Sequence, residues 1–345
     1  MRHACLAIVV IFAALRAAAI EIEDHRFYPA LAGDPAEIPL RVVSTADLDV
    51  FDPYLRAFQT ARPGIAIDYT VVSSADLHRT IGDGAVYDLA LSSAMDLQFQ
   101  LANDGFAQSY RSTATEALPD WARWRDLIFA MSVEPAVVVF STQRFAGLPV
   151  PTTRQELIAL LRAHPDLFTG AVGTYDVRTS GLGYLLATQE DRSTDAFWRL
   201  SEVMGGLDPQ LYCCSGQMID DVSTGRLALA YNVLGSYAAE RLVRESAGQM
   251  QILAMRDFAN VIIRTAIVPA TATRVEAAGA LIDMLATLAL REGRGTWPLP
   301  PLTQTGADAA TGFGPIRLGP ALMVYLDPLN RRGFLAEWEN AMVQR

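Results

Sequence analysis

Four short segments place hydroxyl or amide side chains where a strand is expected to end and a helix to begin. They are Ser44-Thr45, Ser92-Ser93, residues 178–181 and residues 232–236. In open α/β sheets, ligands collect at the carboxyl ends of strands, because the helix N-termini there offer free N–H groups and a positive dipole end. Each segment alone is also an ordinary helix cap. The prediction of an anion site therefore depends on all four segments lying close together in the fold.

The segment from Tyr175 to Gly181 is the most informative of the four. The guanidinium of Arg178 stands just before an expected helix, where it could clamp a carboxylate or phosphate, and Thr179 and Ser180 would complete the cup. The alternative is a salt bridge between Arg178 and Asp176 or another carboxylate. Further along, Tyr231 and Tyr237 flank the fourth segment, which begins at Asn232, and each phenol either donates to an oxyanion or packs in the core.

Catalytic signatures are scarce. The chain has no lysine, which excludes lysine Schiff-base chemistry and the phosphate-binding P-loop. His25, His78 and His164 are not at metal-binding spacings, and the sequence has no G-x-S-x-G, H-E-x-x-H or complete G-x-G-x-x-G motif. We therefore expect a binding protein without cofactor or metal. An exported hydrolase remains the alternative, because catalytic triads need no fixed order.

The first segment and the charge indicate the compartment and exclude one partner. Met1-Arg2-His3 precedes a short apolar run that ends in small residues, which predicts a signal peptide over residues 1–19 and a periplasmic protein. An uncleaved anchor is the alternative, because Arg16 lies close to the expected cleavage site. A net charge of −10 argues against nucleic acid. Cys213 and Cys214 are adjacent, and we expect either two buried thiols or a vicinal bridge.

The rest of the chain alternates apolar strand-like runs with helical stretches, which predicts an α/β fold with mostly parallel sheets. The predicted partition is a first lobe over residues 36–135, a second lobe over 136–258, a return to the first lobe over 259–297 and a C-terminal helical segment over 298–345. The last helix is expected at about residues 322–343.

Three stretches resemble the periplasmic solute-binding proteins of ABC importers, in particular the two-lobed class that carries ferric iron, phosphonates, sugar phosphates and phosphoglycerate-like acids. They are Arg41 to Asp47 with the helix end and P-G-I step over residues 58–65, the strand within residues 223–232, and the returning strand and helix within residues 265–285.

The resemblance implies two α/β lobes of the type II periplasmic binding protein kind, closing by a hinge over a ligand in the cleft. It places ligand contacts on the matching loops, at Ser44, Thr45, Ser92, Ser93, Arg178, Thr179, Ser180, Tyr231 and Asn232. The implied solute is a small anion, a carboxylate or a phosphorylated compound. The implied partner is an importer permease, or alternatively a membrane sensor kinase. Ferric iron is a further alternative, although the adjacent tyrosine pair typical of iron binders is replaced here by Tyr231-Asn232.

Overall fold

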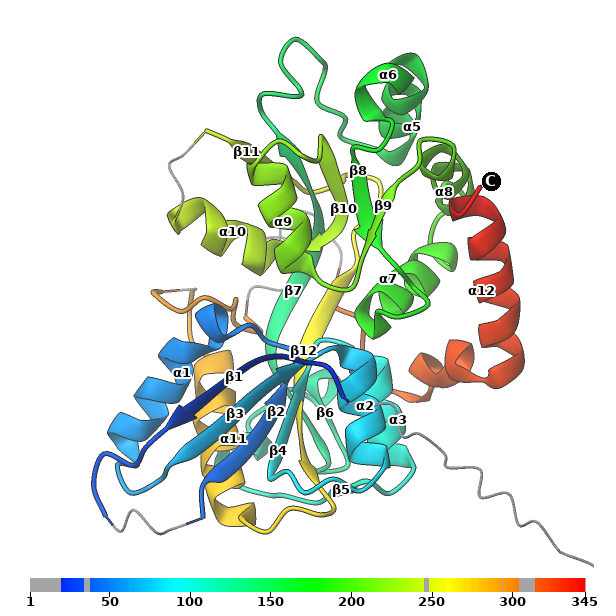
Figure 1. Cartoon of the computed structure of the whole chain (residues 1–345). Helices are drawn as coiled ribbons and strands as arrows, with labels where there is room; N and C mark the ends of the chain where they lie inside the picture. The colour runs from blue at the N-terminus through cyan, green and yellow to red at the C-terminus, as the bar shows by residue number, and fades with distance from the viewer. Residues whose placement is uncertain (1–19, 34–37, 245–247, 294, 304–313, 345) are drawn as a thin grey trace, which may run out of the picture.

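The computed structural model describes residues 20–33, 38–244, 248–293, 295–303 and 314–344. The predicted signal peptide, residues 1–19, lies outside them. The described chain forms two α/β lobes, one below and one above in Figure 1, as the sequence predicts.

The first lobe is a sheet in the order β1-β3-β2-β4-β12, with helices on both faces. Strands β2, β3 and β4 pair in parallel, whereas β1 and β12 pair antiparallel with their neighbours. The sheet is therefore mixed and less parallel than expected. Its elements other than β12 are β1 (Ile22–Tyr28), β2 (Leu40–Ser44), α1 (Leu48–Ala61), β3 (Ile67–Val72), α2 (Ser74–Gly82), β4 (Leu89–Ser92), α3 (Met95–Asn103), β5 (Ala107–Gln108), α4 (Thr113–Glu116), β6 (Arg123–Trp124) and α11 (Val275–Ala289).

The second lobe has β8 at its centre, paired in parallel with β9 and β10. Its apolar interior lies between this sheet and helices α5, α7, α8 and α12. The elements are α5 (Arg154–Ala163), α6 (Pro165–Phe168), β8 (Val172–Tyr175), α7 (Gly181–Asp191), α8 (Phe197–Gly205), β9 (Gln210–Tyr212), α9 (Ser215–Ser223), β10 (Leu229–Leu234), α10 (Gly235–Arg244) and β11 (Met250–Leu253).

Two long antiparallel strands, β7 (Ile128–Ser141) and β12 (Val261–Pro269), run from one lobe to the other (Figure 1). Residues 129–135 of β7 pair with residues 261–266 of β12, and residues 136–141 of β7 pair with β10 and β11. The lobe boundaries predicted at residues 135 and 258 fall within β7 and shortly before β12. Where each lobe ends along these strands stays a prediction.

The C-terminal segment runs alongside both lobes (Figure 1). A 3-10 helix, η2 (Pro320–Leu326), packs on α3, and α12 (Pro328–Met342) packs on α8. The single helix expected from residue 322 is wrong, because Pro328 starts a new helix. The Asp327 side chain accepts hydrogen bonds from the N–H groups of Leu329 and Asn330 and so caps it.

Candidate functional site

A cavity of about 940 Å³ lies between the two lobes. The first lobe contributes the beginning of β1 and the N-terminal ends of α1 and α2. The second lobe contributes Thr179, which precedes α7, the adjacent Cys213 and Cys214, and the first turn of α9. Side chains of both lobes therefore face one cavity. Such a cavity is the usual form of a small-molecule site.

The lining of this cavity is strongly acidic. It contains six carboxylates and one arginine, namely Glu21, Glu23, Asp24, Asp47, Asp49, Asp76 and Arg79. Asp76 pairs with Arg79, and Asp49 pairs with Arg244 at 2.6 Å. Within the described ranges, no arginine forms a salt bridge with Glu23 or Asp47.

These two carboxyl groups have raised pKa values. Desolvation raises the pKa of Glu23 to about 7 although the residue is exposed, and Asp47, Glu21 and Asp76 contribute by repulsion. Burial likewise raises the pKa of Asp47 to about 6, although the nearby guanidinium of Arg264 opposes the rise. For Asp47, desolvation therefore outweighs the positive charge of Arg264 and Arg241, and the ionised form of both carboxyls is disfavoured.

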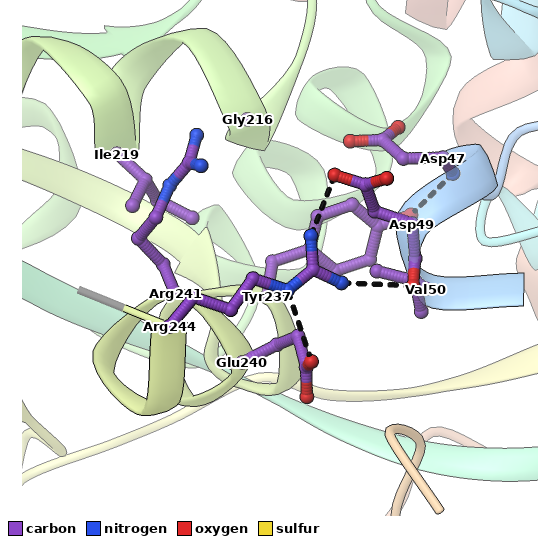
Figure 2. A pocket seen from close by; sticks show the side chains of 9 residues that line it. All are labelled: Asp47, Asp49, Val50, Gly216, Ile219, Tyr237, Glu240, Arg241 and Arg244. Atoms are coloured by element: carbon purple, nitrogen blue, oxygen red, sulfur yellow. Dashed lines mark hydrogen bonds and ion pairs between the residues drawn. The ribbon is translucent and has the colours of Figure 1, made fainter.

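A smaller pocket adjoins the cavity, sharing Asp47, Asp49 and Gly216 with it (Figure 2). Across this pocket, Arg244 of α10 donates to the carboxylate of Asp49 and, at 2.9 Å, to its backbone oxygen. The phenol oxygen of Tyr237 accepts a hydrogen bond from the backbone N–H of Asp47 at 3.1 Å. Because α10 belongs to the second lobe and Asp47 and Asp49 to the first, these bonds link the two lobes.

Cys213 and Cys214 form a vicinal disulfide at the wall of the cavity, which is one of the two alternatives left open by the sequence. Cys214 Sγ lies 3.4 Å from Glu23 Oε1 of the opposite lobe. Glu23 and the two cysteines are close enough to hold a metal ion, but the disulfide occupies both sulfurs.

Comparison with known proteins identifies the family. Residues 40–292 match the model of the bacterial extracellular solute-binding proteins. The chain belongs to this family. No curated protein matches the sequence. None of the described helices has the length and apolar character that crossing a membrane requires.

Solved structures of solute-binding proteins share the fold. A substrate binding protein of an ABC transporter from Agrobacterium tumefaciens is 29% identical, with a TM-score of 0.87 over 94% of this chain and all of that chain. AfuA from Actinobacillus pleuropneumoniae, solved with fructose-6-phosphate, is 13% identical (TM-score 0.69; 89% and 99% covered). Iron-bound HitA from Pseudomonas aeruginosa is 14% identical (TM-score 0.65; 88% and 99% covered).

In this solute-binding protein, the first two predicted segments do not line the cavity. Ser44 and Ser92 are buried, and their hydroxyls accept hydrogen bonds from backbone N–H groups two residues on. Thr45 and Ser93 bond to each other, with their oxygens 3.3 Å apart. Ser44 and Ser92 thus each stabilise their own strand-to-helix loop, and Thr45 and Ser93 join the two loops, whereas neither α1 nor α3 has a side-chain cap.

Only Thr179 of the third segment lines the cavity. Arg178 forms the ion pair with Asp176 that was the alternative interpretation, and it also faces Glu339 at 3.6 Å and the ring of Trp338 at 5.7 Å. Its guanidinium is thus directed to α12 and away from the cleft. Ser180 caps α7, accepting from the N–H of Gly183.

Tyr231 and Asn232 lie inside the second lobe and do not reach the cavity. The Tyr231 hydroxyl and the Asn232 side-chain amide both donate to Glu190, which also pairs with the buried Arg154. This network satisfies a buried charge within the second lobe. It stabilises that lobe, and both residues line a small pocket inside it that shares no lining residue with the interlobe cavity. Their ligand contact stays a prediction.

The residues that do line the cavity were missed for identifiable reasons. The strand β1 falls between the signal peptide and the first predicted strand, although Ile20 and Ile22 alternate with Glu21 and Glu23 as in a half-buried strand. The helix α9 follows the two cysteines, and its apolar residues Met218, Ile219 and Val222 have helical spacing. Both patterns could have predicted the strand and the helix, but neither pattern indicates a ligand site.

Proposed function

We propose that this chain captures a small solute in the interlobe cavity and delivers it to an ABC importer. The family, the cavity walled by both lobes and the likeness to the Agrobacterium tumefaciens transporter subunit support this function. Capture works by differential binding, because a ligand that touches both lobes stabilises the closed form that a membrane partner recognises.

We further propose that the solute carries a positive charge. The observation that carries this proposal is the pair Glu23 and Asp47, two carboxylates without an arginine partner among the described residues, in a cavity lined by six acids and one arginine. A bound cation would lower the cost of ionising both. An ammonium group suits them because it offers charge and several N–H donors.

The lining also argues against the anionic solute expected from the sequence. The N-terminal ends of α1, α2 and α9 do face the cavity, and their free N–H groups would favour an anion. However, α1 begins with Asp47 and Asp49, and α2 has Asp76 in its first turn. These carboxylates complement the helix dipoles and would repel an incoming anion.

Two other cations fit less well. A quaternary ammonium is usually held by aromatic faces, and no aromatic side chain is present among the described residues that line the large cavity. Ferric iron, as carried by HitA, would need phenolate or other oxygen ligands brought together. Here Tyr231 bonds to Glu190 inside the second lobe, whereas Tyr237 bonds to Asp47 beside the cleft.

Titration calorimetry with a panel of probes tests the ligand class. The panel contains putrescine and spermidine as N–H cations, choline as a quaternary cation, ferric citrate, glucose 6-phosphate and inorganic phosphate. We expect the two amines to bind, and Asp47→Asn to weaken that binding by about 1.5–3 kcal/mol, roughly 10- to 100-fold. The control is Asp166→Asn in α6, which does not line the cavity. Binding of a phosphate ester alone would overturn the proposed ligand class.

Crosslinking tests the partner. Amine-loaded protein is crosslinked to membranes of the producing bacterium, and the captured membrane protein is identified by mass spectrometry. An importer permease supports delivery, whereas a sensor kinase would assign the alternative role. Conversion of the bound amine into a new compound would instead indicate an enzyme.

A further inference from the structure

The strand β1 precedes the part of the chain that matches the family model. The match begins at residue 40, and β1 ends at Tyr28. In Figure 1 this dark blue strand runs along the side of the first lobe that faces the second lobe. Among the described strands it pairs with β3 alone and forms the outer edge of the sheet.

The second half of β1 is anchored to the first lobe. His25 Nε2 lies 2.5 Å from Asp68 Oδ1 of β3. Arg26 and the Tyr28 hydroxyl both donate to Asp52 of α1, at 3.2 and 2.9 Å. These bonds fix the position of the strand, so the residues before His25 project toward the cleft from a fixed base.

The pairing of β1 with β3 is interrupted at Glu23. Ile22 is opposite Val72 and Asp24 is opposite Val71, so Glu23 has no residue opposite it. An unpaired extra residue in an antiparallel ladder is a β-bulge, which bends the strand and redirects the side chain of the extra residue. Here the redirected side chain lines the interlobe cavity.

Glu23 reaches the opposite lobe. Its Oε1 is 3.4 Å from Cys214 Sγ, but that sulfur is bonded to Cys213 and has no hydrogen to donate. Gln217, in the first turn of α9, lines the same cavity and offers a side-chain carbonyl as an additional acceptor. The carboxylate and the amide oxygen therefore belong to different lobes and are both suited to an N–H donor.

We infer that β1 supplies a specificity-determining residue to the ligand site, with Glu23 binding a primary or secondary ammonium group of the solute against Gln217 of the second lobe. This inference rests on the proposed function and adds to it the part of the chain that selects the ligand. Because the two acceptors lie on different lobes, an ammonium bound between them stabilises the closed form.

The test measures spermidine and putrescine affinity by calorimetry for four full-length proteins: wild type, Glu23→Gln, Glu23→Asp and the control Glu116→Gln. Glu116 is an exposed acid of the first lobe that pairs with Arg111 and does not line the cavity. We expect Glu23→Gln to weaken binding about tenfold or more, because a charge-assisted contact is lost. Glu23→Asp keeps the charge but shortens the side chain. If the Glu23 carboxylate contacts the ammonium group directly, this variant should also bind the amines more weakly.

Each outcome has a defined meaning. Wild-type affinity in both Glu23 variants, together with loss of affinity in Asp47→Asn, overturns the role of β1 and leaves the proposed function intact. Loss in Glu23→Gln with full affinity in Glu23→Asp means that Glu23 acts only through its charge, and this too overturns a contact role. If wild type binds neither amine, both the inference and the proposed ligand class fail. Unchanged melting temperatures of the unliganded variants establish that they fold.

Discussion

Arg264 of β12 and Glu134 of β7 form a fully buried ion pair where the two strands pass between the lobes. Arg264 Nε lies 2.8 Å from Glu134 Oε1, and a second guanidinium nitrogen lies 3.3 Å from Oε2. The hydroxyls of Ser132 and Ser236 also donate to Glu134. Ser236 belongs to the second lobe, so its bond to Glu134 connects the two crossing strands to that lobe.

Breaking this pair is expected to destabilise the protein strongly. Glu134→Gln leaves the Arg264 guanidinium buried without its counter-charge, which typically costs about 3–5 kcal/mol. Urea unfolding measures the change. The double variant Glu134→Leu with Arg264→Met removes both charges and should recover much of the loss. A double variant as unstable as the single one would mean that packing, and not charge, governs this position.

The stability contributed by Glu134 should also depend on pH. Burial alone would raise the pKa of Glu134, but Arg264 and the hydroxyl donors hold it below its ordinary value. A carboxyl whose folded-state pKa is lowered stabilises the protein above its ordinary pKa and loses that contribution as the pH falls. We expect urea unfolding between pH 6 and pH 3 to show this loss in wild type and not in the double variant.

The interlobe pair of Arg244 and Asp49 should favour closure modestly. The Asp49 side chain is 69% exposed, so solvent and salt weaken the interaction. We expect Arg244→Ala to lower amine affinity by up to about fivefold, and the loss to shrink in high salt. The control Arg226→Ala removes an exposed pair with Asp221 within the second lobe and should leave affinity unchanged. Small-angle scattering of the unliganded Arg244→Ala variant should show a larger radius of gyration.

Replacing Arg178 should affect the C-terminal helix and not the ligand. Its partners are Asp176, Glu339 and the ring of Trp338. We expect Arg178→Ala to keep wild-type affinity for every probe that binds, with a loss of stability of about 1 kcal/mol or less. Calorimetry and thermal unfolding measure the two effects. A large loss of affinity would restore Arg178 to the site that the sequence predicted.

Amine binding should strengthen as the pH rises from 5 to 8. The pKa values of about 7 for Glu23 and about 6 for Asp47 mean that both carboxyls become ionised, and attract a cation, across this range. The effect on the unliganded protein has the opposite sign. Because the folded state holds these protons more tightly than the unfolded state, both groups destabilise it as the pH rises from about 4 to 7.

Melting temperatures measured with and without spermidine between pH 5 and pH 8 test both expectations. The stabilisation by the amine should grow with pH in wild type. The variant with Glu23→Gln and Asp47→Asn should show little of that growth, because it has lost both titrating groups. Equal pH dependence in the two proteins would show that these carboxyls do not control amine binding.

Local patterns in the sequence were sufficient to predict the two-lobed α/β fold and the family. Strand and helix periods are set by neighbouring residues, so the sequence predicts a strand over residues 39–43 and a helix over 49–60, within a residue of β2 and α1 at each end. Elements with weak or ambiguous patterns were not predicted, as with β1. The 3-10 helix η2 and the helix α12, which begins at Pro328, were predicted as one helix.

The ligand chemistry depended on contacts between residues far apart in the chain. Arg178 was predicted to bind an anion because its own neighbours suggest a helix start, but Glu339 and Trp338, which hold it elsewhere, are remote in sequence. Likewise, Glu23 meets Cys214, and Asp49 meets Arg244, across the two lobes, although each pair is remote in sequence. The net charge of the cleft depends on which charged side chains the fold brings together there. The order of residues along the chain does not show which ones these are.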